Sequence, residues 1–329
     1  MNIFRKSFFW FLIFLMAFEF LIARNLAFYG LAPTSSVGQI SSLLKIFDRQ
    51  DKEKIRWLVL GDSQSRDAIR PTLVARELGQ DPGSIFNLSI NAGKPTDFEY
   101  LLRQVVPRLP NLQGVIITVN EHYFDRKDVQ YDPKFRFIAG LGDRAAVPGP
   151  ERKADLVLSW LSYTYGMRLQ WWETMKMVFR GETAPDTDAY PGGLAPVSDS
   201  TEEHYTVKYA KELSTSWLLD FRLPGPESGA LERTLQFLDG QNLSWQMVYL
   251  PKTALIDRII DEKFCRQEQE FFAYVEDLAA RHRKKLYRDF PGLTYDCFRD
   301  VNHMNEKGAE KMAPRMGEII RQMAEKKIS

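Results

Sequence analysis

Three residues that could together perform acyl-group chemistry stand far apart in the sequence: Ser63, Asp300 and His303. Ser63 follows Gly61 and Asp62 directly after an apolar run, which places it in a turn at the start of the next helix. A serine hydroxyl is a weak nucleophile until a neighbouring base removes its proton. In a turn, the three-residue spacing lets Asp300 accept the Nδ1 proton of His303 and leaves Nε2 as the base. Taken singly, the same residues could be only a helix cap, a loop acid and a surface histidine.

Two further residues could donate hydrogen bonds to an oxyanion. Gly93 lies in "NLSINAGKP", residues 87–95, where a glycine lets a backbone N–H approach a developing negative charge. Asn120 follows the apolar run of "VIITVNEHYFD", residues 115–125, and its side-chain amide could donate a second bond. Preorganised donors of this kind typically contribute ~2.7–4 kcal/mol each to the transition state. Either residue could alternatively serve only its own loop.

The elements that must position these residues alternate between strands and helices. Such alternation indicates an α/β fold with a parallel sheet. Sites in parallel sheets lie at the carboxyl ends of strands, which is where Ser63 and Asn120 fall. The predicted strands are residues 55–60, 84–88, 114–119 and 244–250, with a weak fifth at 286–287, and the predicted helices are residues 71–78, 98–106, 268–284 and 305–324.

Residues 1–32 predict an N-terminal membrane anchor. The apolar stretch 8–23 reaches, with its flanks, the ~20 residues that a spanning helix needs. Its one charge, Glu19, is a cost that the membrane interface or a partner helix would relieve. Arg5 and Lys6 precede the stretch and favour a cytoplasmic N-terminus, with the body of the chain on the other side of the membrane. A cleaved signal peptide is the alternative, although the segment has no convincing small-x-small cleavage site.

We expect residues 33–54 to be a polar linker and residues 55–329 to be one α/β domain. An insertion at about 125–243 interrupts the alternation with loop-like stretches rich in Pro, Gly, Asp and Thr. Between these loops, residues 156–180 mix aromatic and basic side chains. They predict either a helical hairpin packed on the core or a lid, a partner surface or a membrane-contacting helix.

Bulk composition argues against several classes of protein. The chain has 329 residues, of which 44% are hydrophobic and 26% charged, an ordinary globular balance. Its net charge of +1 and its lack of finger-like, RNP-like or basic-stripe patterns argue against nucleic-acid binding. Two cysteines and four scattered histidines give no zinc spacing, so we expect no metal and no cofactor. Cys265 and Cys297 could form a disulfide outside the cytoplasm or remain free thiols, because the sequence does not give their separation.

Together these blocks resemble those of the SGNH (GDSL-like) hydrolase superfamily. "GDS" at 61–63 resembles the serine block, Gly93 the glycine block, and "DVNH" at 300–303 the closing Asp-x-x-His block. Asn120 falls where the asparagine block would stand, and the order agrees from residue 55 to the C-terminus. This third block departs from the family's frequent Gly-x-Asn-Asp, because it reads "TVNE" at 118–121.

The resemblance implies a doubly wound parallel sheet in the three-layer SGNH arrangement, with an acyl-transfer site at its edge. Ser63 would attack an ester carbonyl, His303 would take its proton, and Asp300 would orient His303. The N–H groups of Ser63 and Gly93, with the Asn120 amide, would bind the oxyanion.

Within that superfamily, the arrangement is similar to membrane-anchored proteins of bacterial envelope modification. These include the DltD-like proteins of teichoic-acid D-alanylation and the SGNH-like proteins of alginate O-acetylation. The likeness implies a single-pass protein of the cell inner membrane, with its catalytic domain on the periplasmic side beside a membrane-bound O-acyltransferase partner. An acyl group, with acetyl as the first expectation, would pass through Ser63 to an envelope or secreted polysaccharide. The sequence leaves two alternatives open: a carbohydrate O-acetyl esterase with the same triad, and a non-catalytic glycan-binding or scaffold module of a secretion complex.

Two more residues near the expected site could bind substrate. Arg66, just after the nucleophile, could hold a carboxylate or phosphate of an acidic glycan. His122, just after the third block, could contact substrate as well. A solvated helix face and an ordinary loop histidine are the simpler interpretations of these two residues.

Overall fold

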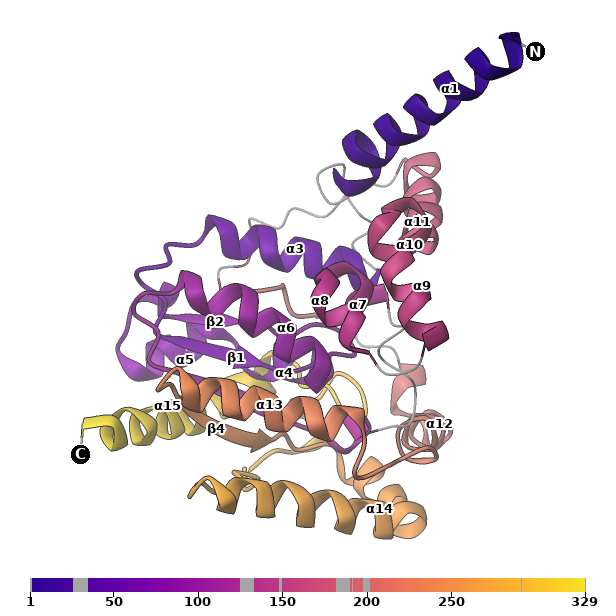
Figure 1. Ribbon diagram of the computed structural model, residues 1–329. Coiled ribbons are helices and arrows are strands. Elements are labelled where there is room, and N and C mark those ends of the chain that lie inside the picture. Colours follow the sequence, from indigo (N-terminus) through magenta and orange to yellow (C-terminus); the bar gives the residue numbers. More distant parts are fainter. Residues whose placement is uncertain are drawn as a thin grey trace. The chain divides into compact units, whose positions relative to one another are not determined.

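The computed structural model describes residues 2–25, 35–124, 133–147, 150–181, 190, 192–197, 202–290 and 292–328. It has α/β structure (Figure 1). Its four-stranded parallel sheet has the strand order β2-β1-β3-β4. The four main predicted strands are confirmed, while the weak strand at 286–287 is reduced to an isolated bridge between Val248 and Tyr287. The strands are β1 (Trp57–Leu60), β2 (Ile85–Asn87), β3 (Gly114–Val119) and β4 (Ser244–Tyr249).

Strand pairing places the ends of β1 and β3 at one edge of the sheet. Every residue of β1, β2 and β3 is buried, which explains why these strands are mainly apolar in the sequence. Leu60, the last residue of β1, is paired with Ile117 of β3. The segments that follow Leu60 and Val119 therefore leave the sheet close together.

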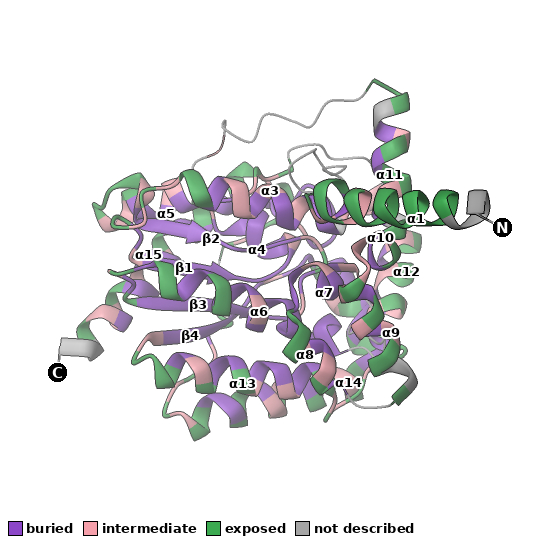
Figure 2. Cartoon of the chain, turned by 45° about the horizontal axis from the view of Figure 1, so that its top comes forward, coloured by how far each residue is buried: buried purple, intermediate pink, exposed green. Residues whose placement is uncertain are grey.

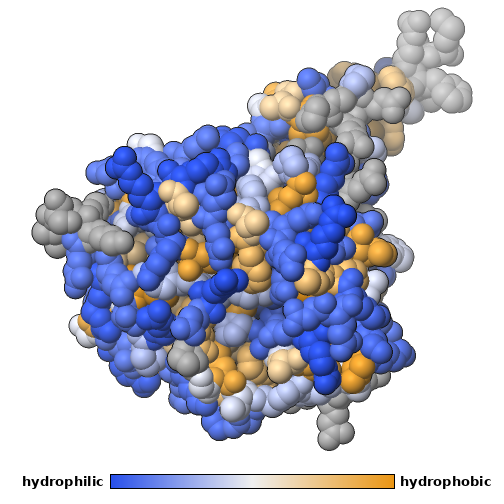
Figure 3. Space-filling view, turned by 90° about the horizontal axis from the view of Figure 1, so that it is seen from below, coloured by the Kyte–Doolittle hydropathy of each residue, from blue (hydrophilic) through white to orange (hydrophobic). Residues whose placement is uncertain are grey.

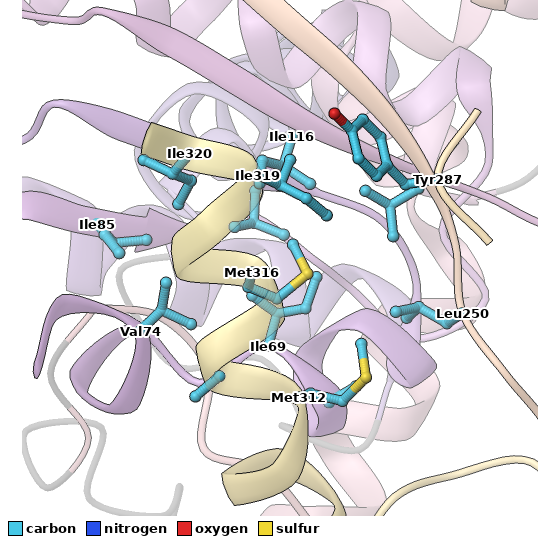
Figure 4. Packing of buried hydrophobic residues seen from close by; sticks show 14 of the residues in the cluster. Ile69, Val74, Ile85, Ile116, Leu250, Tyr287, Met312, Met316, Ile319 and Ile320 are labelled. Atoms are coloured by element: carbon cyan, nitrogen blue, oxygen red, sulfur yellow. The ribbon is translucent and has the colours of Figure 1, made fainter. Parts of the chain in front are cut away.

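One hydrophobic core joins the sheet to α5 (Pro71–Leu78) and α15 (Glu306–Ile328). In α15, Met312, Met316 and Ile319 recur at helical spacing, so they lie on one face of the helix. Figure 4 shows them packed among side chains from α5 and from the sheet, including Val74 and Ile116. Both helices lie close to their predicted ranges, because the helical spacing of their apolar residues can be recognised in the sequence.

Two predicted helices are longer in the structure. α14 (Ala254–Arg281) begins well before the predicted residue 268, and it carries a kink at Phe264, where φ is −132°. Its first turns bury Leu255 and Ile259 in a core shared with α12 (Val207–Leu218). α6 (Pro95–Val105) begins three residues early, since the Asp97 side chain accepts the backbone N–H at the N-cap.

Residues 36–49, predicted as part of a linker, instead form the helix α3 (Ser36–Arg49). Its apolar residues Val37, Ile40 and Leu43 are buried, and the polar residues at both ends of the segment concealed this pattern. Residues 26–34, which the prediction divides between anchor and linker, lie outside the described residues.

The remaining helices complete the described chain. They are α1 (Asn2–Ala17), α4 (Ser63–Ala68), α7 (Pro133–Ile138), α8 (Leu141–Ala146), α9 (Pro150–Leu161), α10 (Tyr163–Gly166), α11 (Arg168–Phe179) and α13 (Pro226–Gly240).

The chain divides into two compact units. One comprises Met1–Leu44 with Asp128–Asp186, and the other Lys45–Lys127 with Thr187–Ser329. The expected insertion at about 125–243 is therefore divided: its first half belongs with the N-terminal segment, and its second half with the unit that contains the sheet. The face of the molecule seen in Figure 3 is largely hydrophilic, with hydrophobic residues in separate groups.

The N-terminal helix is apolar and exposed. The stretch Lys6–Asn25 is long and apolar enough to cross a membrane, judged by length and composition. α1 continues through a π-helical turn (Phe18–Ile22) and a 3₁₀ turn (Ala23–Asn25). Figure 2 shows the exposed residues along α1.

The cysteines do not form the disulfide that the sequence left open. Cys265 is exposed on α14, whereas Cys297 is buried in the core that joins the sheet to α5 and α15. Both are free thiols.

Candidate active site

The turn after β1 is shaped by Gly61 and Asp62. A Cβ at position 61 would overlap the side chain of Ser65, so only glycine fits there. The Asp62 carboxylate caps α4 by accepting the backbone N–H groups of Gln64 (2.9 Å) and Ser65 (3.3 Å). Ser63 is the first residue of α4, and its own N–H lies outside this cap. The helix cap, Asp62, and the predicted nucleophile, Ser63, are therefore different residues of one turn.

The structure brings the three predicted triad residues together. Ser63 Oγ lies 2.8 Å from His303 Nε2, and His303 Nδ1 lies 2.8 Å from Asp300 Oδ2. The other Asp300 oxygen accepts the backbone N–H groups of Asn302 (2.9 Å) and His303 (2.7 Å), which fixes the carboxylate in its turn. This is the geometry of an activated serine, with a base on the hydroxyl and an orienting acid on the base.

The electrostatics of Asp300 favour its charged form. Burial by itself would raise the pKa of this carboxyl. The hydrogen bond and charge of His303 and the two backbone N–H groups outweigh burial, so the pKa of Asp300 lies below its ordinary value. The carboxylate can therefore hold a proton on His303 Nδ1 while remaining charged.

A buried ion-pair network lies behind the triad, and the sequence analysis did not find it. Arg299 Nη1 is 3.2 Å from Asp300 Oδ2, and its Nε and Nη2 donate to Asp67 Oδ2 at 3.1 and 2.9 Å. Asp67 is fully buried and lies one helical turn after Ser63 on α4. The network ties the helix that begins at Ser63 to the turn that holds Asp300 and His303. Asp67 and Arg299 stand next to predicted site residues in the sequence, but nothing local indicates that they pair with each other.

Arg66 is part of this network rather than of a solvated helix face. Only 6% of the residue is exposed, its Nε donates to Asp67 (2.9 Å), and its Nη1 donates to Asn91. The solvated interpretation of Arg66 is wrong. Its role in substrate binding stays a prediction, and binding an anion would require exchange of these partners.

The glycine block packs directly on the serine turn. A Cβ at Gly93 would lie 2.6 Å from the carbonyl oxygen of Gly61, which explains why a glycine stands there. The Gly93 N–H donates to the carbonyl of Ile90 (3.1 Å), so in this structure it is already engaged. Its predicted oxyanion role would require that bond to be exchanged.

Asn120 lies at the carboxyl end of β3, as predicted. It is 2% exposed, and its side-chain oxygen is buried without a hydrogen-bond partner among the described residues. A buried polar atom left unpaired is costly, so such atoms often mark a site that a ligand completes. The oxyanion role of Asn120 remains a prediction.

His122 pairs with Asp62, the residue before Ser63. Its Nε2 lies 2.9 Å from Asp62 Oδ2, and its ring stacks on Trp217 with centroids 4.8 Å apart. Burial would raise the pKa of Asp62, but the hydrogen bond and charge of His122, with the charge of His303, lower it overall. His122 is thus a largely buried partner of the cap, and its substrate contact stays a prediction.

A buried ion pair holds the residue between Asn120 and His122. Lys252 Nζ lies 2.7 Å from Glu121 Oε1, and both side chains are fully buried. Burial would lower the pKa of Lys252, but the charges of Glu121 and Tyr249 raise it overall, so the lysine stays charged. Because Lys252 follows β4, this pair fixes the turn after β3 to the end of the neighbouring strand.

Comparison of the sequence with protein-family models and with curated proteins finds no match. Within the described part of the chain, no group of three or more His, Cys, Asp or Glu side chains is arranged to hold a metal ion.

Proposed function

We propose that the chain is a serine-dependent O-acyltransferase of the SGNH type, which passes an acyl group, with acetyl as the first expectation, to a polysaccharide hydroxyl. The observation that carries the proposal is the pair of 2.8 Å hydrogen bonds that link Ser63, His303 and Asp300. The polysaccharide acceptor comes from the family resemblance.

The proposed reaction has two balanced half-reactions. His303 Nε2 takes the Ser63 proton as Oγ bonds to the ester carbonyl carbon, and it then gives that proton to the departing alkoxide. The product is an acyl ester on Ser63. In the second half, His303 takes the proton of the acceptor hydroxyl as that oxygen attacks the acyl carbon, and it returns the proton to Ser63. Asp300 keeps the imidazole in one tautomer throughout.

The oxyanion would be bound by the N–H groups of Ser63 and Gly93 with the Asn120 amide, each worth ~2.7–4 kcal/mol. The close packing of Gly93 on Gly61 supports this assignment.

The proposal includes the finer fold and the location. Packing supports a doubly wound, three-layer arrangement, because successive residues of a strand face opposite sides of the sheet. Ile85 lies in the core with α5 and α15, whereas its neighbour Phe86 meets Phe47 of α3, with ring centroids 5.3 Å apart. The apolar stretch Lys6–Asn25 would cross the inner membrane with the N-terminus in the cytoplasm. The α/β unit would then be periplasmic, beside a membrane-bound O-acyltransferase that supplies acyl groups.

The test is acyl transfer by the full chain in proteoliposomes, given an activated acetyl ester and a deacetylated polysaccharide. We expect acetylated polysaccharide with the wild type and with Ser216→Ala, a change at an exposed serine of α12, and none with Ser63→Ala. Acetate release that the polysaccharide does not reduce would identify an esterase with the same triad. Full transfer by Ser63→Ala would refute the proposal.

A further inference from the structure

One face of α11 exposes large apolar side chains. Trp172, Met175 and Phe179 are 61%, 45% and 82% exposed, and their spacing places them on the same side of the helix. Arg168 and Lys176 fall on this side as well, with the Lys176 ammonium 5.4 Å from the Trp172 ring centroid. Aromatic and basic residues on one face are typical of helices that lie at a membrane surface.

The opposite side of α11 is already packed. Gln170, Thr174 and Met177 are buried, so the exposed face is additional to the one that holds the helix in its unit. Single exposed apolar residues need no explanation, but a continuous row of them marks an interaction surface.

The anchor helix contacts the same part of the chain. The Phe18 ring lies 5.8 Å from the ring of Trp171, the residue before Trp172. Glu19 accepts hydrogen bonds from the backbone N–H (3.1 Å) and hydroxyl (2.9 Å) of Thr164, at the start of α10. Its charge is therefore satisfied by a helix of its own unit.

A second contact lies farther along the anchor. Arg24 Nη2 donates to the carbonyl oxygens of Trp160 (2.9 Å) and Leu161 (3.1 Å), at the end of α9. The anchor is thus attached to α9, α10 and α11 through residues of its own apolar stretch, because Phe18, Glu19 and Arg24 all lie within Lys6–Asn25.

The length of the anchor sets the depth of these contacts. An α-helix rises by about 1.5 Å per residue, so residues 7–18, before Glu19, make only about 18 Å of helix. The hydrocarbon core of a bilayer is about 30 Å thick. A spanning helix would therefore need nearly all of Lys6–Asn25. Arg24, with the end of α9 that it holds, would then lie at the level of the membrane interface, and Glu19, five residues earlier, would lie about 7.5 Å deeper.

We propose that the exposed face of α11 lies on the outer surface of the bilayer that the anchor crosses. Trp172, Met175 and Phe179 enter the interfacial region, and Arg168 and Lys176 meet the phosphates of anionic lipids. The occupant is lipid, because the helix that carries this face contacts, through Trp171 and Phe18, an anchor that is itself apolar and exposed. The inference rests on the membrane anchoring in the proposed function and is independent of the acyl chemistry.

The test places an environment-sensitive fluorophore at Phe179→Cys in a Cys265→Ser background, in the full chain. The wild type labelled at Cys265, an exposed native thiol, is the matched control. Both go into vesicles of phosphatidylethanolamine and phosphatidylglycerol. We expect nitroxide lipids to quench the position-179 label several-fold more than the control, and aqueous iodide to quench it several-fold less.

Resistance to alkaline carbonate extraction, measured in parallel, reports the anchoring separately. An anchored chain whose position-179 label is as open to iodide as the control would overturn the inference alone. Shielding from both quenchers would also overturn it, because a protein would then cover the face. A chain released by carbonate would overturn the inference together with the proposed anchoring.

Discussion

Replacing Asp300 with asparagine tests the orienting role of its carboxylate. The oxygen that accepts the backbone N–H groups of Asn302 and His303 can remain, so the turn should keep its shape. The oxygen facing His303 Nδ1 becomes an NH₂ group, which donates. His303 must then accept at Nδ1 and carry its proton on Nε2, which faces Ser63 and can no longer act as a base.

The expected loss is large for activity and small for stability. The equivalent change in a serine protease lowers kcat by about 10⁴-fold. The new NH₂ would also face Arg299 Nη1, now 3.2 Å from the carboxylate oxygen, which adds a contact between two donors. We therefore expect acylation of Ser63 to slow by about 10³–10⁴-fold, or ~4–5.5 kcal/mol. Losing the charge-assisted bonds should lower the free energy of unfolding by about 1–3 kcal/mol.

The assay is the pre-steady-state burst of nitrophenol from p-nitrophenyl acetate, with urea denaturation of the same samples. Asp296→Asn is the matched control, because Asp296 lies in the same loop but is exposed and paired with Lys307. Asp296→Asn should acylate at the wild-type rate. A folded Asp300→Asn variant that acylates within about tenfold of wild type would refute the proposed role.

Three further predictions concern the surroundings of the site. Burial raises the pKa of Glu227 to about 7 from 4.5. Between these two pH values the folded chain keeps a proton on Glu227 that the unfolded chain has released. The free energy of unfolding therefore falls as the pH rises from about 4.5 to about 7. Glu227→Gln can still accept hydrogen bonds from Thr96. It should raise the free energy of unfolding by up to about 3 kcal/mol at about pH 8 and leave it unchanged at about pH 4.5. Equal effects in urea denaturation at both pH values would contradict this prediction. Lys252→Met should lower the free energy of unfolding by about 3–5 kcal/mol, because the buried Glu121 carboxylate loses its partner. Adding Glu121→Gln should recover most of that loss. If urea denaturation finds Lys252→Met within about 1 kcal/mol of wild type, the buried pair is ruled out. Arg299→Lys keeps the charge but loses the fork that joins Asp67 and Asp300, so acylation should slow by about tenfold in the burst assay, and an unchanged rate would remove Arg299 from the positioning of the triad.

Local patterns account for what the sequence predicted well. The strands are mainly apolar because they are buried in a parallel sheet. Asp300 and His303 are three residues apart, so their pairing is encoded in one short turn. Ser63 was identifiable because Gly61 and Asp62 mark the turn before it.

The rest depends on contacts between distant segments. Arg299 pairs with Asp67, which lies 232 residues away in the sequence, and no local sequence pattern predicts such a pairing. His122 was predicted as a possible substrate contact, but its pairing with Asp62 depends on how the ends of β1 and β3 meet. α3 was missed for a different reason, since the polar residues at its ends outweighed a buried apolar stripe.

Direct detection of an acyl-enzyme tests the central claim, which is that Ser63 is the nucleophile of a working triad. The full chain is exposed to an activated acetyl ester, quenched in acid, and examined by intact mass and peptide mapping. We predict one acetyl group on Ser63 in the wild type, and none at that position in His303→Ala. An unmodified Ser63 in a folded wild-type chain, or acetylation of Ser63 that is equally fast without His303, would contradict the account.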